Sequence, residues 1–203
     1  MWALVQDGTV TKTFNYAKGF VLNDTQYPKD IFTKWSKAEK EAIGIYEVIV
    51  DKTNYKDSEY YNNTDSTIAF ANGQVTESWG TATAKRLVDE NAVDEDGNPV
   101  LENGVQVINY GLKTEKKRIV KDQAAGLLAK TDWYVVKATE VADYTVPADI
   151  TTYRAAVRTK SNQMETAIDN AADVDALKAL YEYTDDGNGN ITRPLGEWPE
   201  EVI

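Results

Sequence analysis

The spacing of apolar residues changes from a strand pattern to a helix pattern part-way along this chain of 203 residues. The first part holds short β-favouring runs separated by turn residues, whereas beyond residue 112 apolar residues recur every three or four positions. Strands and helices that are segregated along a chain favour the α+β class. We therefore expect a small β-rich N-terminal module, residues 1–87, and a helical C-terminal module, residues 112–203.

Local signals predict the content of the N-terminal module. Asp-Gly at 7–8 and Asn-Gly at 72–73 stand between β-favouring runs and predict two hairpins, because these dipeptides adopt the positive φ angles of a tight turn. Ser36 and Glu39 have the spacing of a capping box, which predicts one short helix. Residues 45–50, rich in β-branched and aromatic side chains, predict a further strand.

Residues 88–111 are acidic and rich in turn formers, which predicts a linker or a surface hairpin. Asp94, Asp96 and Asn98 alternate as the oxygen ligands of a calcium loop do. However, Gly97 does not occupy the sixth position of such a loop, and Val105 stands where the bidentate glutamate belongs. We expect a turn here and no metal ion.

Helical spacing predicts a long helical hairpin followed by a short helix and an ordered tail. The first helix would start near Lys113, and its core-facing residues would be Leu112, Ile119, Ala124, Leu127, Leu128 and Trp133. The second would open at Pro147 with Ile150, Tyr153, Ala156, Val157, Met164 and Ile168 facing the core. The third would span residues 174–183. A buried Trp198 would then fix the C-terminal tail to the helices.

Composition narrows the range of functions. The absence of histidine and cysteine removes the usual general base, thiolate nucleophiles and the commonest metal ligands. A net charge of -11 repels nucleic acid and anionic lipid. No apolar run approaches the roughly 18 residues that span a bilayer, and the N-terminus lacks a signal-peptide pattern. We expect no enzyme, catalytic residue, cofactor, nucleic acid partner or membrane insertion.

Glycoside hydrolysis by a pair of carboxylates is the one enzymatic alternative that composition leaves open, because it needs no histidine. However, no spacing in the sequence singles out such a pair.

Several segments resemble the C-terminal region of bacteriophage tail-fibre assembly proteins. They are LLAKTDWY at 127–134, Val-Pro at 146–147, YRAAVR at 153–158 and Glu-Trp-Pro at 197–199. The resemblance covers roughly residues 112–203. Trp-Ala-Leu-Val at 2–5, Tyr-Pro at 27–28 and Ile-Gly-Ile-Tyr at 43–46 are similar to the start of small proteins encoded near phage tail genes.

The resemblance implies a non-enzymatic phage tail protein, a fibre assembly chaperone or adaptor that binds tail or fibre proteins. The alternative is a permanent virion structural protein, a tail, fibre or capsid-associated subunit. A glycan-degrading hydrolase is the distant third. The chain could also associate with copies of itself as a homo-oligomer. The expected location is the host cytoplasm during assembly, with the virion tail as the other place.

Two groups of residues are candidates for partner binding, because Trp, Tyr and Arg dominate binding hot spots. They are Trp133, Tyr153, Arg154, Arg158 and Trp198 in the helical module, and Tyr55, Tyr60 and Tyr61 in a polar loop. The opposing interpretation is structural: Trp133 and Tyr153 would pack the two long helices together, and Arg154 would pair with a carboxylate. One or two of the loop tyrosines would then simply cover the sheet.

Overall fold

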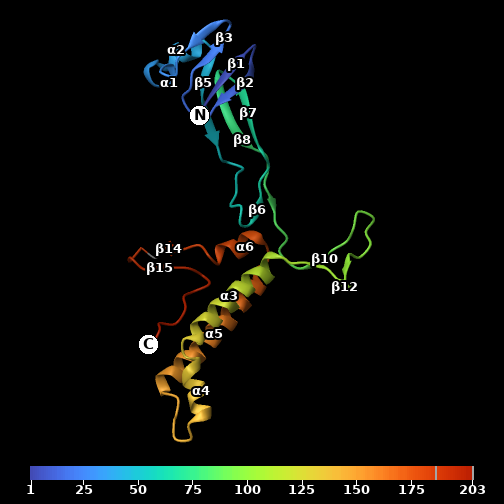
Figure 1. The fold of residues 1–203 in the computed structure, drawn as a ribbon, viewed down its shortest axis with the longest axis vertical. Helices are drawn as coiled ribbons and strands as arrows, with labels where there is room; N and C mark the ends of the chain where they lie inside the picture. Colours follow the sequence, from blue (N-terminus) through green and yellow to red (C-terminus); the bar gives the residue numbers. More distant parts are fainter. Residues whose placement is uncertain (186, 203) are drawn as a thin grey trace. The chain divides into compact units, whose positions relative to one another are not determined.

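The computed structural model describes residues 1–185 and 187–202 and has the mixed α+β composition that the sequence predicts. The chain forms two compact units, Met1–Thr83 and Ala84–Ile203. The first is β-rich and the second is largely helical (Figure 1). Residues 88–111, which the sequence analysis set apart, belong to the second unit. The helices that the structure describes include none that is long and apolar enough to cross a membrane.

The first unit is built on a five-stranded sheet with the order β2-β1-β5-β8-β7 (Figure 1). These strands are β1 (Trp2–Gln6), β2 (Thr9–Phe14), β5 (Ile45–Asp51), β7 (Ser66–Ala71) and β8 (Gln74–Trp79). Neighbours are antiparallel except β5 and β8, which run parallel. The outer strands β2 and β7 also come into contact, so the sheet curls. Two short pairs complete the strands: β3 (Phe20–Leu22) with β4 (Thr25–Tyr27), and β6 (Tyr61–Asn62) with β9 (Thr83–Ala84).

Both predicted hairpins are confirmed, with the backbone angles that their turn residues favour. Asp7 and Gly8 have φ of 49° and 76° between β1 and β2. Asn72 and Gly73 have φ of 52° and 74° between β7 and β8. Two successive residues at positive φ match the right-handed twist of the flanking strands, which fixes the register of each pair.

The interior of the first unit is aromatic. Phe14 is fully buried, with its ring 5.0 Å from that of Phe20 and 5.2 Å from that of Phe32. Helix α1 (Ile31–Lys34) contributes Phe32, and the β3–β4 hairpin contributes Phe20. The remaining fully enclosed members of this core are Leu4, Ile31 and Ile45. Three sequence-distant segments therefore meet around Phe14.

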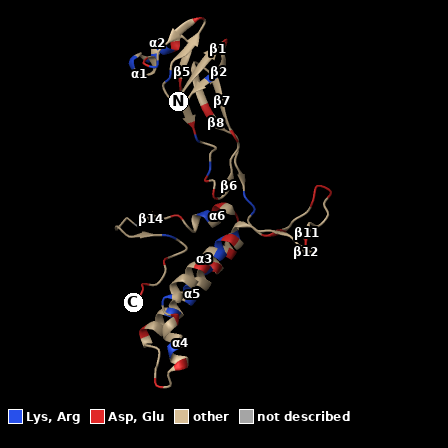
Figure 2. Cartoon of the chain, viewed as in Figure 1, with Lys and Arg blue, Asp and Glu red and all other residues tan. Residues whose placement is uncertain are grey.

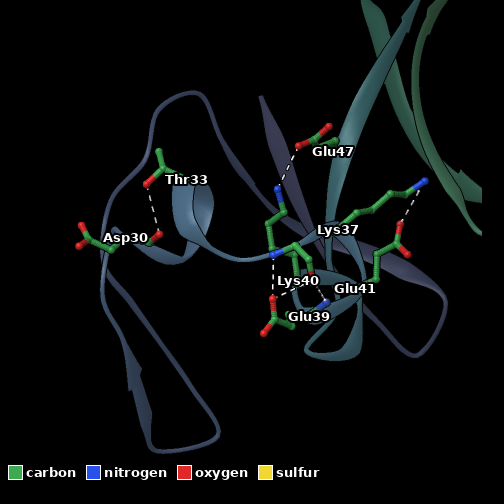
Figure 3. A network of polar contacts seen from close by, with 8 residues as sticks. Asp30, Thr33, Lys37, Glu39, Lys40, Glu41 and Glu47 are labelled. Atoms are coloured by element: carbon green, nitrogen blue, oxygen red, sulfur yellow. Dashed lines mark hydrogen bonds and ion pairs between the residues drawn. The ribbon is translucent and has the colours of Figure 1, made fainter.

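Helix α2 (Lys37–Ala42) has the predicted capping box. The Ser36 amide donates to the Glu39 carboxylate at 2.8 Å, and the Glu39 amide donates to Ser36 Oγ at 3.3 Å. Lys40 is buried on the same helix, and its Nζ lies 3.0 Å from Glu47 Oε1 on β5 (Figure 3). Gly44 then reverses the chain at φ 80°, where a Cβ atom would lie 2.5 Å from the Val5 carbonyl oxygen.

The second unit is organised by two long helices, α3 (Leu112–Ala129) and α5 (Ala148–Asn170), which lie side by side (Figure 1). They are antiparallel, because Lys117 near the start of α3 pairs with Asp169 at the end of α5 at 2.7 Å. The buried positions of α3 are Leu112, Lys116, Val120 and Ala124, and the apolar ones of α5 are Ile150, Tyr153, Val157, Met164 and Ile168. Ile119, which we expected in the core, is 43% exposed.

The other elements of the second unit are short. Helix α4 (Asp132–Glu140) follows α3, and α6 (Val174–Ala179) follows α5. Two-stranded ladders join β10 (Glu90–Asn91) to β13 (Ile108–Asn109), β11 (Leu101–Glu102) to β12 (Val105–Gln106), and β14 (Thr184–Asp185) to β15 (Ile191–Thr192). Residues 90–109 thus form a surface hairpin with two turns. One lies between the bridged Val93 and Pro99, and the other is at Asn103 and Gly104, with φ of 50° and 80°.

Candidate functional site

The end of the helical hairpin holds most of the candidate residues. We define the hairpin tip as residues 128–154, which comprise the end of α3, α4, the α4–α5 connection and the first turns of α5. The sequence predicted one continuous helix through Trp133, and this is wrong. Helix α3 ends at Ala129 and α4 starts at Asp132.

The Leu128 carbonyl explains where α3 ends. It accepts hydrogen bonds from the Thr131 amide at 3.0 Å, from Thr131 Oγ1 at 2.9 Å and from Arg154 Nη1 at 2.8 Å. In a continuing helix this carbonyl would serve the amide four residues later. Three donors from Thr131 and Arg154 therefore stabilise a bend instead.

Arg154 holds the bend from the opposite helix. Its Nη1 also donates to Thr131 Oγ1 at 2.6 Å, and its Nη2 lies 2.8 Å from Asp132 Oδ1. Thr131 is fully enclosed, and Arg154 is only 8% exposed. The expected pairing of Arg154 with a carboxylate is confirmed, and the carboxylate is Asp132. The guanidinium builds the tip rather than lying on its surface.

Helix α4 presents an apolar surface to solvent. We define the α4 patch as Trp133, Val135, Val136 and Val141, whose exposed fractions are 52%, 40%, 51% and 46%. None of the nine residues of α4 is buried. The expectation that Trp133 packs α3 against α5 is wrong, because the bend at Thr131 turns the following residues away from the positions that a continuous helical period assigns.

Aromatic and cationic side chains border the α4 patch. The Trp133 ring lies over that of Tyr134, with 3.7 Å between centroids. Lys137 Nζ lies 5.8 Å from the Trp133 centroid and 4.3 Å from that of Tyr144. These contacts hold the rings in place, and an aromatic group so held loses little entropy when a partner covers it.

Tyr153 lies in the interior beside the tip, and Trp198 is half-buried against it. Tyr153 is buried with Ala124 and Val157, and Trp198 packs against this cluster while its Nε1 donates to Gln123 at 3.1 Å. Burial raises the pKa of the Tyr153 hydroxyl, and the Glu201 carboxylate raises it further. The expectation that Trp198 fixes the C-terminal tail to the helices is confirmed by these contacts.

The remaining candidates lie apart from the patch. Arg158 is exposed on α5, and its guanidinium donates to the Arg154 carbonyl at 3.4 Å. In the first unit, Tyr55 is partly exposed and meets Trp79 edge-on at 5.2 Å. Tyr60 and Tyr61 are buried, which agrees with the structural interpretation of that loop rather than with a contact surface.

Sequence reasoning missed the three valines of the α4 patch. For Val135 and Val136 the signal was present, because Trp-Tyr-Val-Val at 133–136 is an apolar run that no single face of a helix can bury. Such a run on a short helix indicates an exposed apolar surface.

Carboxylates do not gather into a metal centre within the described residues. Asp94, the first candidate calcium ligand, accepts hydrogen bonds from the Asn98 amide at 2.8 Å and the Asp96 amide at 3.0 Å. These bonds, above all those from Asn98, hold the pKa of Asp94 below its ordinary range. The side chain closes a turn.

Comparisons with protein-family models, with curated proteins and with solved structures found no match to this chain.

Proposed function

We propose that this chain is a non-enzymatic bacteriophage tail protein that binds tail-fibre or other tail components, and that it uses the α4 patch to do so. It acts as an assembly chaperone or adaptor. The resemblance of residues 127–134 and 153–158 to tail-fibre assembly proteins supports the class of protein. The structure adds that these two segments contact each other through Arg154.

The observation that carries the proposal is the exposure of α4. Helices shorter than about 12 residues are marginal in water and are normally held by packing of an apolar face. Helix α4 instead leaves Trp133, Val135 and Val136 in solvent, on a bend that Thr131 and Arg154 hold in place. A pre-shaped apolar surface of this kind is typical of a binding site for another protein.

Charged residues stand close to the patch in the sequence, and such residues are typical of the rim of protein interfaces. Lys137 and Glu140 belong to α4, and Asp143 and Asp149 follow in the connection and in α5. We expect Trp133 to enter a pocket of the partner while these charges remain at the edge. Burial of the apolar atoms then drives association, and the charges select the partner.

A permanent virion subunit is the second candidate, and the surface hairpin at residues 90–109 favours it. Val93, Leu101 and Val105 are exposed there, in addition to the α4 patch. Permanent assemblies bury larger and more apolar interfaces than transient complexes do. Two separate apolar surfaces fit that class.

Deletion of the gene from the phage tests the proposal. Particles produced without this chain should lack fibre proteins when purified and quantified by mass spectrometry, and complementation with the wild-type chain should restore them. Particles that retain a full complement of fibre and tail proteins after deletion would contradict a tail assembly role.

Mass spectrometry of wild-type particles separates the two candidates. Peptides of this chain at a fixed ratio to a major tail protein identify a permanent subunit. Their reproducible absence from particles, in cells that synthesise the chain, identifies a chaperone that leaves.

A further inference from the structure

The surface hairpin has side chains that its own fold leaves without neighbours. We define the arm as residues 90–109. Val93, Leu101 and Val105 on the arm are all more than half exposed. Two ladders of two residues each and a single bridge between Val93 and Pro99 hold the arm together. Such short pairings bury little apolar area and are marginally stable alone in water. The arm is therefore a segment that gains stability when another surface covers it.

Contacts just outside the arm hold its base firmly to α3. The Leu112 amide donates to the Arg86 carbonyl at 2.9 Å, and Asp89 accepts from the Gly111 amide at 2.8 Å and from Thr114 Oγ1 at 2.9 Å. Gly111 is required at this junction, because a Cβ atom there would lie 2.5 Å from the Val88 backbone. The base fixes the direction in which the arm leaves the helices.

The arm carries negative charge without compensation. Asp94 closes a turn and Glu90 pairs with Arg86, but Glu95, Asp96 and Glu102 are exposed. In residues 1–185 and 187–202 their carboxylates accept no hydrogen bond and form no ion pair. Figure 2 shows acidic residues on the arm and a mixture of basic and acidic residues along α3.

The first half of α3 offers the complementary surface. A groove of about 640 Å³ is lined by Tyr110, Thr114, Glu115, Lys117, Arg118 and Lys121. Lys117 pairs with Asp169 and Lys121 with Glu165 on α5. Arg118 is exposed and has no ion pair within the described part of the chain. Tyr110 and the aliphatic stems of Lys117 and Lys121 contribute apolar atoms to the lining of this groove, which also includes Glu115.

We infer that two copies of this chain associate reciprocally, with the acidic arm of each copy in the α3 groove of the other. Valine and leucine of the arm meet the apolar atoms of the groove, and Glu95 and Asp96 lie against Arg118. Both halves of the contact occur on one chain, so a two-fold axis satisfies them twice, as in most closed dimers. This inference does not depend on the proposed function.

Sedimentation velocity of the full chain tests the inference. The wild type should form a dimer at about 0.1 M salt and dissociate towards monomer at about 1 M, because the Debye length falls from about 10 Å to about 3 Å. Arg118→Glu should weaken the dimer by about tenfold or more. Lys29→Glu is the matched control, since Lys29 is exposed in the first unit and makes no ion pair among the residues described.

A charge exchange makes the test independent of folding. The double variant Glu95→Lys/Asp96→Lys should also be monomeric, because it repels Arg118. Mixed with Arg118→Glu, it should form a heterodimer. In this heterodimer the acidic arm of the Arg118→Glu chain meets Arg118 of the double variant, as in the wild type. The lysines of the other arm meet the glutamate introduced at position 118, so that the charges of this contact are reversed.

Three outcomes overturn the inference. If the wild type stays monomeric at about 0.1 M salt, the α3 groove does not bind the arm of a second copy, and its partner is an acidic segment of a different protein. A dimer that Arg118→Glu weakens no more than Lys29→Glu does places the interface elsewhere. Failure of the two charge variants to associate when mixed shows that their charges do not meet.

Discussion

The N-terminal unit and the hairpin tip place their aromatic residues in opposite environments. In the first unit the rings of Phe14, Phe20 and Phe32 surround one another in the interior. At the tip, Trp133 lies over Tyr134 at the surface. The first arrangement stabilises the fold by itself, whereas the second leaves apolar area for another molecule to cover. Stability and binding should therefore respond to different mutations.

Truncation of the central ring should give the largest loss of stability. Phe14→Ala leaves a cavity at the centre of the core that Phe20, Phe32 and Ile31 share, and we expect the free energy of unfolding of the first unit to fall by about 3–5 kcal/mol. Chemical denaturation followed by amide hydrogen exchange, read separately for each unit, measures this. Val21→Ala, at an exposed position of β3, is the control and should change it little. A small effect of Phe14→Ala would contradict the account of this core.

Loss of the buried guanidinium should loosen the tip without affecting the first unit. Arg154→Met keeps the aliphatic stem but removes the donors to Leu128 and Thr131, so we expect a local loss of about 2 kcal/mol. Faster amide exchange in residues 128–140 is the readout. Arg158→Met on the same helix is the matched control, because Arg158 donates only to its own helix in the described hydrogen bonds. Equal exchange in both variants would show that Arg154 does not hold the bend.

A smaller effect should follow from the ion pair between α2 and β5. The hydrogen bond from Lys40 lowers the pKa of Glu47 from its ordinary value of 4.5. A carboxyl whose pKa is lower in the folded state contributes stability above the unfolded pKa and loses it as pH falls through the folded pKa. Because the Glu47 side chain is 61% exposed and water screens the pair, Glu47→Gln should lower the free energy of unfolding by less than about 1 kcal/mol at neutral pH. It should have no effect once the pH lies below the folded-state pKa of Glu47. Unfolding measured across pH tests this, with Asp65→Asn as the control, because Asp65 is exposed and makes no ion pair among the described residues. If the free energies of unfolding of the wild type and of Glu47→Gln differed by the same amount at every pH, the ion pair between Lys40 and Glu47 would not be the cause of that difference.

Changes in the α4 patch should have the smallest effect on stability. Trp133→Ala/Val136→Ala removes exposed apolar atoms and introduces the best helix former, so we expect unfolding to change by no more than about 0.5 kcal/mol. Circular dichroism and thermal unfolding measure it. A large loss would mean that Trp133 supports the fold, as the sequence had suggested.

Local signals made the first unit predictable. Asp7-Gly8, Asn72-Gly73 and the Ser36 capping box each determine structure within a few residues, and all three are confirmed. The parallel pairing of β5 with β8 could not be predicted in this way, because it joins segments that no short motif connects. The order of the sheet depends on which strands bury the Phe14 core together.

The tip was harder to predict because a tertiary contact shapes it. Residues 128–134 contain neither proline nor glycine, so the sequence indicated a continuous helix. Arg154, more than twenty residues away, supplies the donors that end α3 at this point. The structural interpretation of the sequence anticipated the pairing of Arg154 with a carboxylate, but not the bend or the exposure of Trp133.

Fibre content of phage particles assembled with the altered patch tests the central claim most directly. A phage lacking the gene is complemented with the wild-type chain, with Trp133→Ala/Val136→Ala, or with Val21→Ala, and fibre protein per particle is measured by mass spectrometry. We predict wild-type fibre content with Val21→Ala and a loss of at least about tenfold with the patch variant, whose fold is intact. Full fibre content with the patch variant would contradict the claim that α4 binds tail components.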